Sequence, residues 1–271
     1  MKLSVNNVVF NYGSKDTLKD ITLEAKEGKI LGILGQNGCG KTTLLKCIDR
    51  MLKPQGGCIT IDGAGEDIFD ERTKVNDKES VDIKEMSQKE LARSIAVVSQ
   101  SAYVSFPFTS FDVVMMGRYA RYKGSEKENR EAVIDAMKRS GSLEFAERAV
   151  NELSGGELRR VMIGRALAQE PKVLLLDEPT LHLDVNHQFD LMNLITDLKK
   201  SNIVIIIVTH DLMFAARYCD QVILMEKGQI VAAGETMDVL TRENIKSLFE
   251  IEAIVEYDER VGGPNVIMIG R

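Results

Sequence analysis

The stretch "KILGILGQNGCGKTT", residues 29–43, decides the fold of this chain. A β-rich apolar run leads into a glycine-rich loop with the spacing Gly35-x-x-x-x-Gly40-Lys41-Thr42, and a helical pattern follows. Glycines let such a loop curl around phosphates, while backbone amides and the N-terminus of the helix favour an anion. The stretch therefore predicts a nucleotide triphosphate site, in which Lys41 neutralises phosphate oxygens and Thr42 offers its hydroxyl to Mg²⁺.

The helix after the loop is expected to cover residues 42–52. Its apolar residues share one face, and the helix is expected to end at Lys53-Pro54, because the residue before a proline disfavours helical geometry. The residues assigned to this face are Leu44, Leu45, Ile48, Met51 and Leu52. This face is predicted to pack on the sheet.

Strands and helices alternate along much of the remaining chain. Near the N-terminus, strands are predicted within residues 2–13, 21–28 and 58–63. Further on, the pattern predicts a strand at 94–100, a helix at 156–169, a strand at 172–177, a helix with a leucine stripe at 191–198 and a strand at 202–208. Buried parallel strands that alternate with helices imply a doubly wound α/β core.

Three segments depart from this alternation. Residues 64–85 are rich in charge without a sustained period, so they are predicted to form a solvated loop. From 109 to 150 the pattern is helical, and Ser125 and Glu128 have the spacing of a capping box. The residues at 221–234 and 253–271 are expected to form hairpins with glycine turns.

The composition limits the class of partner. The 271 residues carry a formal net charge of −6, which argues against nucleic acid or an anionic bilayer as a partner. The hydrophobic share of 44% is ordinary for a soluble globular protein. The first ten residues do not resemble a secretory signal, and the longest apolar run, at 203–208, falls far below the roughly 20 residues of a membrane span. A cytoplasmic protein is expected.

The four cysteines show no zinc-binding spacing and are expected to be reduced, structural thiols. Cys39 lies inside the glycine loop, where amide dipoles could lower the pKa of its thiol. Sensitivity of Cys39 to alkylation is therefore a hypothesis.

Polar residues follow three of the predicted buried strands. Asp177 and Glu178 end the run "VLLLDE", His210 follows "IVIIIVT", and Gln100 ends "SIAVVSQ". At the edge of a parallel sheet, Asp177 is expected to hold hydrated Mg²⁺ and Glu178 to polarise the attacking water. His210 is expected to contact the γ-phosphate, and Gln100 to reach Mg²⁺ or the water.

The sequence "LSGGE" at 153–157 resembles the signature of the ATP-binding-cassette family, and six further motifs occur in the family's order. Tyr12 is similar to its adenine-stacking aromatic residue, Gln100 to its Q-loop, Leu183-Asp184 to its D-loop and His210 to its switch histidine. The Walker B motif corresponds to residues 173–178. The Walker A motif supplies Gly35, Asn37, Gly38, Cys39, Gly40, Lys41, Thr42 and Thr43 as nucleotide-binding residues.

The resemblance implies a single ATPase domain over residues 1–271. A P-loop NTPase core of the RecA type, with an antiparallel β subdomain, would occupy 1–100 and 165–271. An α-helical signature subdomain would occupy 101–164.

In this family two copies dimerise head to tail. The resemblance implies that Ser154, Gly155 and Gly156 bind the γ-phosphate of ATP held by the other copy, so that hydrolysis opens the dimer. Glu157 stands where many members have glutamine, and it would bring negative charge near the phosphate.

The segments at 86–120 and 178–195 resemble ATPase subunits of importers for iron–siderophore, haem and cobalamin. This resemblance implies a homodimer beneath two membrane permease subunits, at the cytoplasmic face of the membrane, fed by an extracytoplasmic substrate-binding protein. The alternative is a soluble ATPase of the same family that acts in iron–sulfur assembly. A GTPase or a small-molecule kinase would leave "LSGGE" unexplained, and a non-catalytic module would not need both Asp177 and Glu178.

Overall fold

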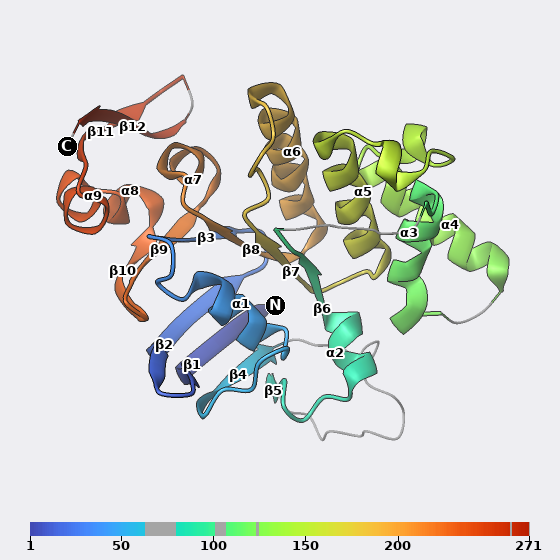
Figure 1. Ribbon diagram of the computed structural model, residues 1–271, viewed down its shortest axis with the longest axis horizontal. Coiled ribbons are helices and arrows are strands. Elements are labelled where there is room, and N and C mark those ends of the chain that lie inside the picture. Colours follow the sequence, from blue (N-terminus) through green and yellow to red (C-terminus); the bar gives the residue numbers. More distant parts are fainter. Residues whose placement is uncertain (63–79, 101–106, 123–124, 261, 271) are drawn as a thin grey trace. The chain divides into compact units, whose positions relative to one another are not determined.

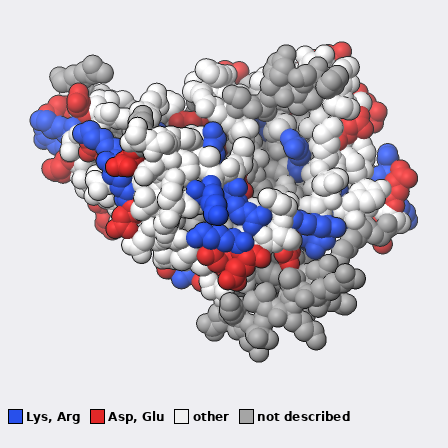
Figure 2. All heavy atoms as spheres, turned by 60° about the horizontal axis from the view of Figure 1, so that its bottom comes forward, with Lys and Arg blue, Asp and Glu red and all other residues white. Residues whose placement is uncertain are grey.

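The computed structural model describes residues 1–62, 80–100, 107–122, 125–260 and 262–270, which form two compact units (Figure 1). The described residues of the first unit come from Met1–Gly63, Glu79–Glu85 and Val204–Arg271, and those of the second from Met86–Ile203. In these parts of the chain, no helix combines the length and the hydropathy needed to cross a membrane. Figure 2 shows one face, on which Lys and Arg side chains gather beside Asp and Glu side chains.

The first unit contains an antiparallel sheet with the strand order β2-β1-β4-β5. Its strands are β1 (Lys2–Tyr12), β2 (Lys15–Lys26), β4 (Gly56–Asp62) and β5 (Ser80–Asp82). In β1 the register with β2 shifts between Val5 and Val8, where Asn7 has a φ of 50°. Because of this irregularity, Val5 and Val8 are both buried although their spacing does not fit the regular alternation of a strand.

Strand β5 corrects the prediction of a loop over 64–85. Most of that segment lies outside the described residues, but Ser80–Asp82 pairs with β4, with Val81 opposite Ile61. Val81 and Ile83 are two residues apart, so an extended chain places their side chains on the same face, and both are buried. In the sequence, the charged residues around Val81 and Ile83 make this short alternation of apolar residues hard to recognise.

A second sheet of the first unit carries the glycine loop. Strand β3 (Ile30–Gly35) pairs in parallel with β8 (Val204–Thr209) on one side and β9 (Gln221–Glu226) on the other, and β10 (Gln229–Glu235) extends it antiparallel to β9. Every residue of β3 and β8 is buried, as expected of central parallel strands. The remaining elements are α1 (Lys41–Ile48), α7 (Leu212–Tyr218), α8 (Thr236–Val239), α9 (Arg242–Phe249), β11 (Glu252–Asp258) and β12 (Gly263–Gly270). The two predicted hairpins, β9-β10 and β11-β12, are confirmed.

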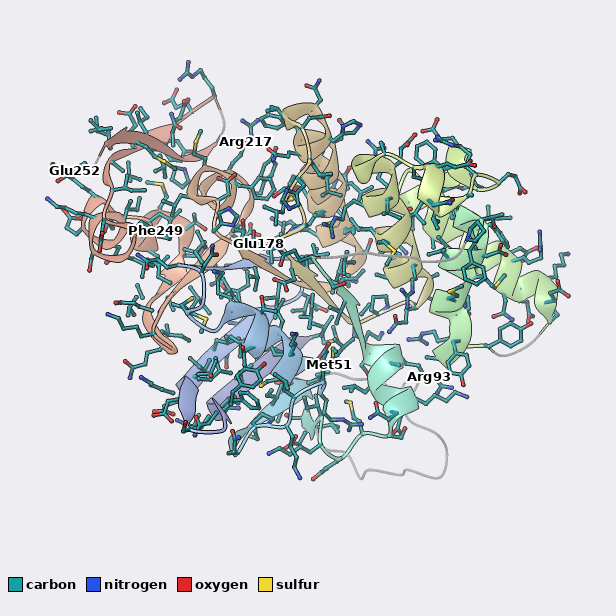
Figure 3. All side chains as sticks on the ribbon, viewed as in Figure 1. Met51, Arg93, Glu178, Arg217, Phe249 and Glu252 are labelled. Carbon is teal, nitrogen blue, oxygen red and sulfur yellow. The ribbon has the colours of Figure 1, made fainter. Side chains whose placement is uncertain are left out.

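Helix α1 is shorter than the predicted helix over 42–52. It ends at Ile48, and Arg50 then adopts a left-handed conformation with a φ of 61°. The N–H of Leu52 donates to the carbonyl of Lys46 at 2.8 Å, which closes the turn. Met51, labelled in Figure 3, is 72% exposed, so its assignment to the buried face was wrong.

The second unit contains two parallel strands, β6 (Ile95–Val98) and β7 (Val173–Asp177). Its α-helices are α2 (Gln88–Ser94), α3 (Ser110–Met116), α4 (Glu126–Arg139), α5 (Gly155–Ala168) and α6 (Val185–Leu198). Its 3₁₀ helices are η1 (Gly117–Ala120), η2 (Leu143–Phe145), η3 (Val150–Glu152) and η4 (Lys199–Ser201). The predicted helical region and the capping box of Ser125 and Glu128 are confirmed. The division into a RecA-like part and a helical part at residues 101 and 164 stays a prediction.

Helices α3 and α5 approach closely at Gly117. A Cβ atom at this position would lie 2.1 Å from the carbonyl oxygen of Arg165, so no other residue fits without a shift of the backbone. The next residue, Arg118, is buried and donates to the carbonyl of Ala168 at 2.9 Å. This hydrogen bond satisfies a helix-end carbonyl and holds the two helices together.

The turn between β9 and β10 is hydrogen-bonded to the glycine loop. The N–H of Gly228 donates to the carbonyl of Cys39 at 3.0 Å, and the carbonyl of Gly228 accepts from the N–H of Lys19 at 2.7 Å. Gly228 has a φ of +83°, and a Cβ atom on it would lie 2.4 Å from the carbonyl oxygen of Thr17. Glycine is thus required here for its conformation and for the close approach of β2.

Replacement of Gly228 by alanine should lower the free energy of unfolding more than the same change at Gly13. Gly13 has a φ of +60° and nothing within 4 Å of its Cβ position, so Gly13→Ala adds only the left-handed strain of about 1–2 kcal/mol. Gly228→Ala adds the overlap with β2, for a total of about 3 kcal/mol. Urea denaturation of the two variants and the parent measures the difference, and equal losses would contradict the role given to Gly228.

Candidate functional site

The glycine loop joins β3 to α1 in the first unit, and Gly35 and Gly40 sit where side chains would collide with backbone. A Cβ atom on Gly35 would lie 2.3 Å from the carbonyl oxygen of Met225, and one on Gly40 would lie 2.9 Å from that of Thr17. Gly38 and Gly40 have φ values of 81° and 110°. Neighbouring strands therefore clamp the loop in a conformation that only glycine adopts easily.

Lys41 turns back into this loop. Its side chain is buried, and its Nζ donates to the carbonyls of Gly35 at 2.7 Å and Gln36 at 3.2 Å. The N-cap residue of α1 is Gly40, which has no side chain to occupy the first amides of the helix. The positive end of the helix and an ammonium group thus converge, as in sites that bind phosphate.

Cys39 does not behave as the sequence suggested. Its side chain is buried, and its Sγ lies 2.7 Å from the position that a Cβ atom on Gly35 would occupy. Burial raises the pKa of the Cys39 thiol, and the nearby charge of Lys41 only partly opposes this shift. The expected lowering of the thiol pKa by loop amides was wrong, since desolvation outweighs it.

His210 and Tyr12 belong to the same unit as the loop. Because β3 and β8 are parallel, with Leu34 opposite Thr209, His210 leaves the sheet at the edge where the glycine loop begins. Tyr12 ends β1, is 48% exposed and packs edge-on against Phe10, with ring centroids 4.8 Å apart. The following strand, β2, contacts the loop at Gly40, so the hairpin that carries Tyr12 is anchored to it.

In the second unit, Asp177, Glu178 and Gln100 lie at the ends of two neighbouring strands. Strands β6 and β7 are parallel, with Val98 opposite Leu176, so the chain leaves both strands at the same edge of the sheet. Asp177 is the last residue of β7, Glu178 follows it, and Gln100 comes two residues after β6. Asp177 and Glu178 are 6% and 8% exposed. Glu178, labelled in Figure 3, has a φ of 47°, a strained conformation for glutamate that is typical of functional sites.

Arg159 is a residue of this edge that the sequence pattern did not identify. Its buried guanidinium, on α5, donates to the carbonyls of Ser99 at 2.8 Å and Gln100 at 3.0 Å. Burial lowers the pKa of Arg159, whereas the charge of Asp177 raises it. Arg159 therefore fixes the backbone of Gln100 to the helix that begins at "SGG". In the sequence, the only indication of Arg159 was the run "LRR" at 158–160, directly after the signature.

The signature residues begin α5. The hydroxyl of Ser154 accepts from the N–H of Glu157 at 3.3 Å, and the Glu157 carboxylate accepts in return from the N–H of Ser154 at 2.7 Å. Arg148 donates to the same carboxylate at 2.8 Å. The backbone N–H of Ser154, and then Arg148, hold the pKa of Glu157 below its usual range. Its negative charge is thus already compensated by a cation and by amides.

Gly156 is needed for close packing on α6. A Cβ atom on it would lie 2.7 Å from Cδ2 of His187. The ring is fixed by Asp184, the N-cap residue of α6, whose carboxylate bonds the N–H of His187 at 3.0 Å and its Nδ1 at 2.8 Å. These hydrogen bonds lower the pKa of Asp184. The structure thus joins the signature to Leu183-Asp184 through His187, a residue that the sequence pattern did not point to.

Replacement of Glu157 by alanine should lower the free energy of unfolding by about 1 kcal/mol, the usual contribution of a helix cap. Glu157→Gln should cost less, because an amide oxygen can still accept from Ser154 while only the charge facing Arg148 is lost. Since the folded pKa of Glu157 lies below its ordinary value of about 4.5, the Glu157 contribution is complete above that pH and disappears in stronger acid. Urea denaturation at neutral and acid pH should show the gap between parent and Glu157→Ala narrowing as pH falls.

Alkylation should distinguish Cys39 from Cys58, which is only partly buried. With a buried thiol whose pKa is raised, Cys39 should react with iodoacetamide more slowly than Cys58 at pH 7. Peptide mass spectrometry over a series of pH values gives both rates. Faster labelling of Cys39 than of Cys58 at pH 7 would show that the thiol is accessible and activated.

Comparison with known proteins supports the resemblance. The family profile described as "ABC transporter" matches residues 18–181. An uncharacterised ABC transporter ATP-binding protein of Methanocaldococcus jannaschii is 42% identical over 100% of this chain and 99% of its own length. The ferric enterobactin transport ATP-binding protein of Escherichia coli is 33% identical over 100% of this chain and 95% of its own.

A solved structure agrees with these sequence matches. The ADP conformation of an ATP-binding cassette from an ABC transporter superposes with a TM-score of 0.78 at 26% identity, covering 92% of this chain and 99% of that one. The predicted fold class, an α/β cassette with parallel and antiparallel sheets, is confirmed. The family profile spans more than half of the chain, and the two relatives align with it from end to end. This chain belongs to the ABC transporter family, among its ATP-binding subunits.

Proposed function

We propose that this chain is the ATP-hydrolysing subunit of an importer for iron–siderophore, haem or cobalamin. The observation that carries the nucleotide part is the glycine loop, with the ammonium of Lys41 turned into it at the N-terminus of α1, where the N-cap residue is Gly40. Such a loop binds the phosphates of a nucleotide. Subunits of this family are ATPases, so ATP is the substrate.

The transported solute is inferred from relatives. Besides the ferric enterobactin protein, the matched proteins include subunits named for cobalamin import, iron(3+)-hydroxamate import and hemin import. Each of these solutes is a large metal complex. Full-length similarity to transport subunits favours the importer over a soluble ATPase of iron–sulfur assembly.

The nucleotide would be held mainly by the residues of the glycine loop. Lys41 and the amides of the loop would bind the β- and γ-phosphates, and Tyr12 would stack on adenine. The residues assigned to nucleotide binding are Tyr12, Gly35, Asn37, Gly38, Cys39, Gly40, Lys41, Thr42 and Thr43 from one copy, with Ser154, Gly155 and Gly156 from the other. Cys39 would contribute through its backbone, because its side chain is buried.

The donor set is compatible with Mg²⁺. Within the described residues there is no group of three or more His, Cys, Asp or Glu side chains able to hold a metal. Mg²⁺ does not require such a cage, since it usually binds through one or two carboxylates, with further oxygens from phosphates, water and other side chains. Thr42, Gln100 and Asp177 would supply those oxygens, and the bound ion would neutralise charge on the phosphates.

Glu178 is proposed to orient and deprotonate the attacking water. It is 8% exposed and follows β7 directly with a strained backbone, as is common for residues of functional sites. His210, which follows β8, would contact the γ-phosphate. Gln100, held by Arg159, would contact Mg²⁺ or water.

A second copy would complete the site. The Ser154 hydroxyl, which shares hydrogen bonds with Glu157, would contact a γ-phosphate oxygen. The exposed start of α5 would add its amides. ATP would hold the two copies together, and loss of the γ-phosphate would release them. The dimer would drive two permease subunits from the cytoplasmic face of the membrane, with an extracytoplasmic protein delivering the solute.

The variant Glu178→Gln should bind ATP with an affinity close to that of the parent but hydrolyse it at least about 100-fold more slowly, because it cannot accept the proton of water. ATP should then hold the variant as a dimer, visible by size-exclusion chromatography with light scattering. The contrasting variant Lys41→Ala should lose nucleotide binding and remain monomeric. Hydrolysis at the parent rate by Glu178→Gln would place the base elsewhere.

Affinity purification of the tagged chain from its native membranes tests the importer. A polytopic permease should copurify with the parent chain and equally with Glu178→Gln, which changes the proposed water-activating carboxylate alone. Recovery of the chain with iron–sulfur assembly proteins and without a permease would favour the alternative function.

A further inference from the structure

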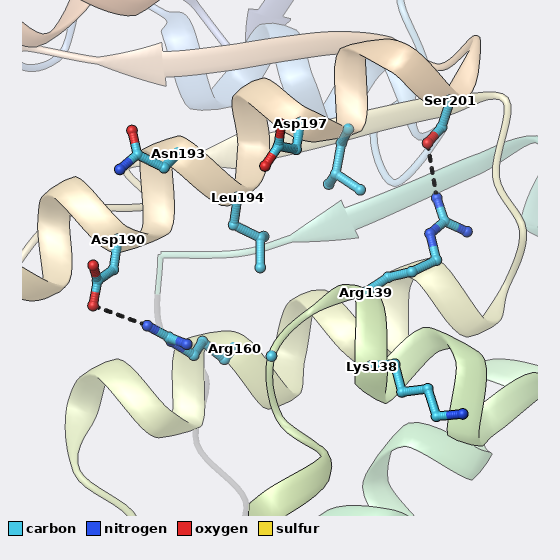
Figure 4. Close-up of a pocket in the computed structure, with 10 residues that line it drawn as sticks. Lys138, Arg139, Arg160, Asp190, Asn193, Leu194, Asp197 and Ser201 are labelled. Carbon is cyan, nitrogen blue, oxygen red and sulfur yellow. Dashed lines mark hydrogen bonds and ion pairs between the residues drawn. The ribbon is translucent and has the colours of Figure 1, made fainter.

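A groove in the second unit lies between α6 and the pair α4 and α5, apart from the residues assigned to ATP. Its volume is about 520 Å³, within the range of ligand-binding pockets (Figure 4). One wall is α6 from Asp190 to Leu198, continued by Ser201, and the other comes from the end of α4, the following turn and Arg160. Helical rise gives the α6 wall a length of roughly 18 Å.

An arginine stands at each end of the groove. Arg160 on α5 donates through Nη2 to Asp190 at 3.0 Å, and Arg139 at the end of α4 donates through Nη2 to Ser201 at 3.2 Å. Figure 4 shows these two hydrogen bonds as the bridges across the groove, with Leu194 between them. The side chains of Arg160 and Arg139 are 27% and 35% exposed, so each guanidinium is partly desolvated and still reachable.

Arg160 has room in the groove because of the turn after α4. Gly141 has a φ of +63°, and a Cβ atom on it would lie 2.9 Å from Nη1 of Arg160. A guanidinium has five N–H donors, and the bond to Asp190 uses one nitrogen. The Arg160 side chain is therefore held in place with donors that a further acceptor can engage.

The charge of the groove is opposite to that of the whole chain. Three basic and two acidic residues line it, which leaves an excess of one positive charge. Asp190 pairs with Arg160 at 3.0 Å, Asp197 with Lys200 at 2.7 Å, and Arg139 lies 4.0 Å from Asp135, outside the lining. The chain as a whole has a formal charge of −6. Because the basic side chains flank a leucine, an occupant with carboxylates at both ends and an aliphatic centre would match the groove in charge and polarity.

We propose that this groove binds an acidic peptide segment of a partner protein. An extended chain advances about 3.3 Å per residue, so about five residues span the groove. Carboxylates near the two ends would bind Arg160 and Arg139, and an aliphatic side chain between them would contact Leu194. The groove is open to solvent and not an enclosed cavity, as an extended chain requires and a small enclosed metabolite does not.

Fluorescence anisotropy with the full-length chain tests the proposal. The probe is a labelled peptide with the sequence Glu-Ser-Leu-Ser-Glu, blocked at both ends, and the matched probe has Gln in place of both Glu. The acidic probe should bind, the Gln probe should bind at least about tenfold more weakly, and added salt should reduce the difference. Equal binding of the two probes would overturn the proposal.

Variants of the chain locate the binding. Arg139→Gln combined with Arg160→Gln should weaken the acidic probe about tenfold, whereas Arg165→Gln, an exposed arginine elsewhere on α5, should leave its affinity unchanged. Asp190→Asn removes the carboxylate that competes for Arg160, so it should strengthen binding about threefold. This gain cannot arise from misfolding.

Three results would contradict the assignment. They are no binding of the acidic probe at millimolar concentration, unchanged affinity in the double arginine variant, and weaker binding by Asp190→Asn. Displacement of the probe by citrate at an equal concentration would identify the ligand as a small free carboxylate, and the peptide proposal would be wrong.

Discussion

The close approach of backbone to backbone around the glycine loop is the constraint on which the first unit depends. Gly35, Gly40 and Gly228 each sit where a Cβ atom would come within 3 Å of a carbonyl oxygen of a neighbouring strand. Lys41 turns its amino group into this loop, and the N-cap residue of α1 is Gly40, which has no side chain. Close packing thus shapes the loop that we propose to bind phosphate.

The second unit depends instead on the ends of its helices. Ser154 and Glu157 fix the start of α5 through reciprocal hydrogen bonds, and Arg148 neutralises the carboxylate. Gly156 allows α6 to approach, with the ring of His187 filling the space that a side chain would need. The exposed helix start that we propose to bind a second copy's ATP is therefore held in place by the capping box and by Arg148.

The patterns that predicted the fold well were long and regular. The buried runs of β3, β7 and β8 and the helices α4, α5 and α6 lie where their periodicity placed them, because long periodic segments bury a continuous apolar face. Local exceptions were missed. Helix α1 ends early at a left-handed Arg50, and the short strand β5 is hidden among charged residues. The thiol of Cys39 is desolvated, which the sequence around it does not reveal.

By itself, the sequence determined the chemistry of the chain: a phosphate loop, carboxylates after buried strands and a signature with its family resemblance are all fixed by residue type and spacing. Only the tertiary structure decided which residues support that chemistry. Arg159 reaches the carbonyl of Gln100, Gly228 reaches Cys39, and Arg139 and Arg160 face one groove, although these partners are far apart in the chain. Local spacing cannot encode such contacts, because they arise when separate helices and strands pack together.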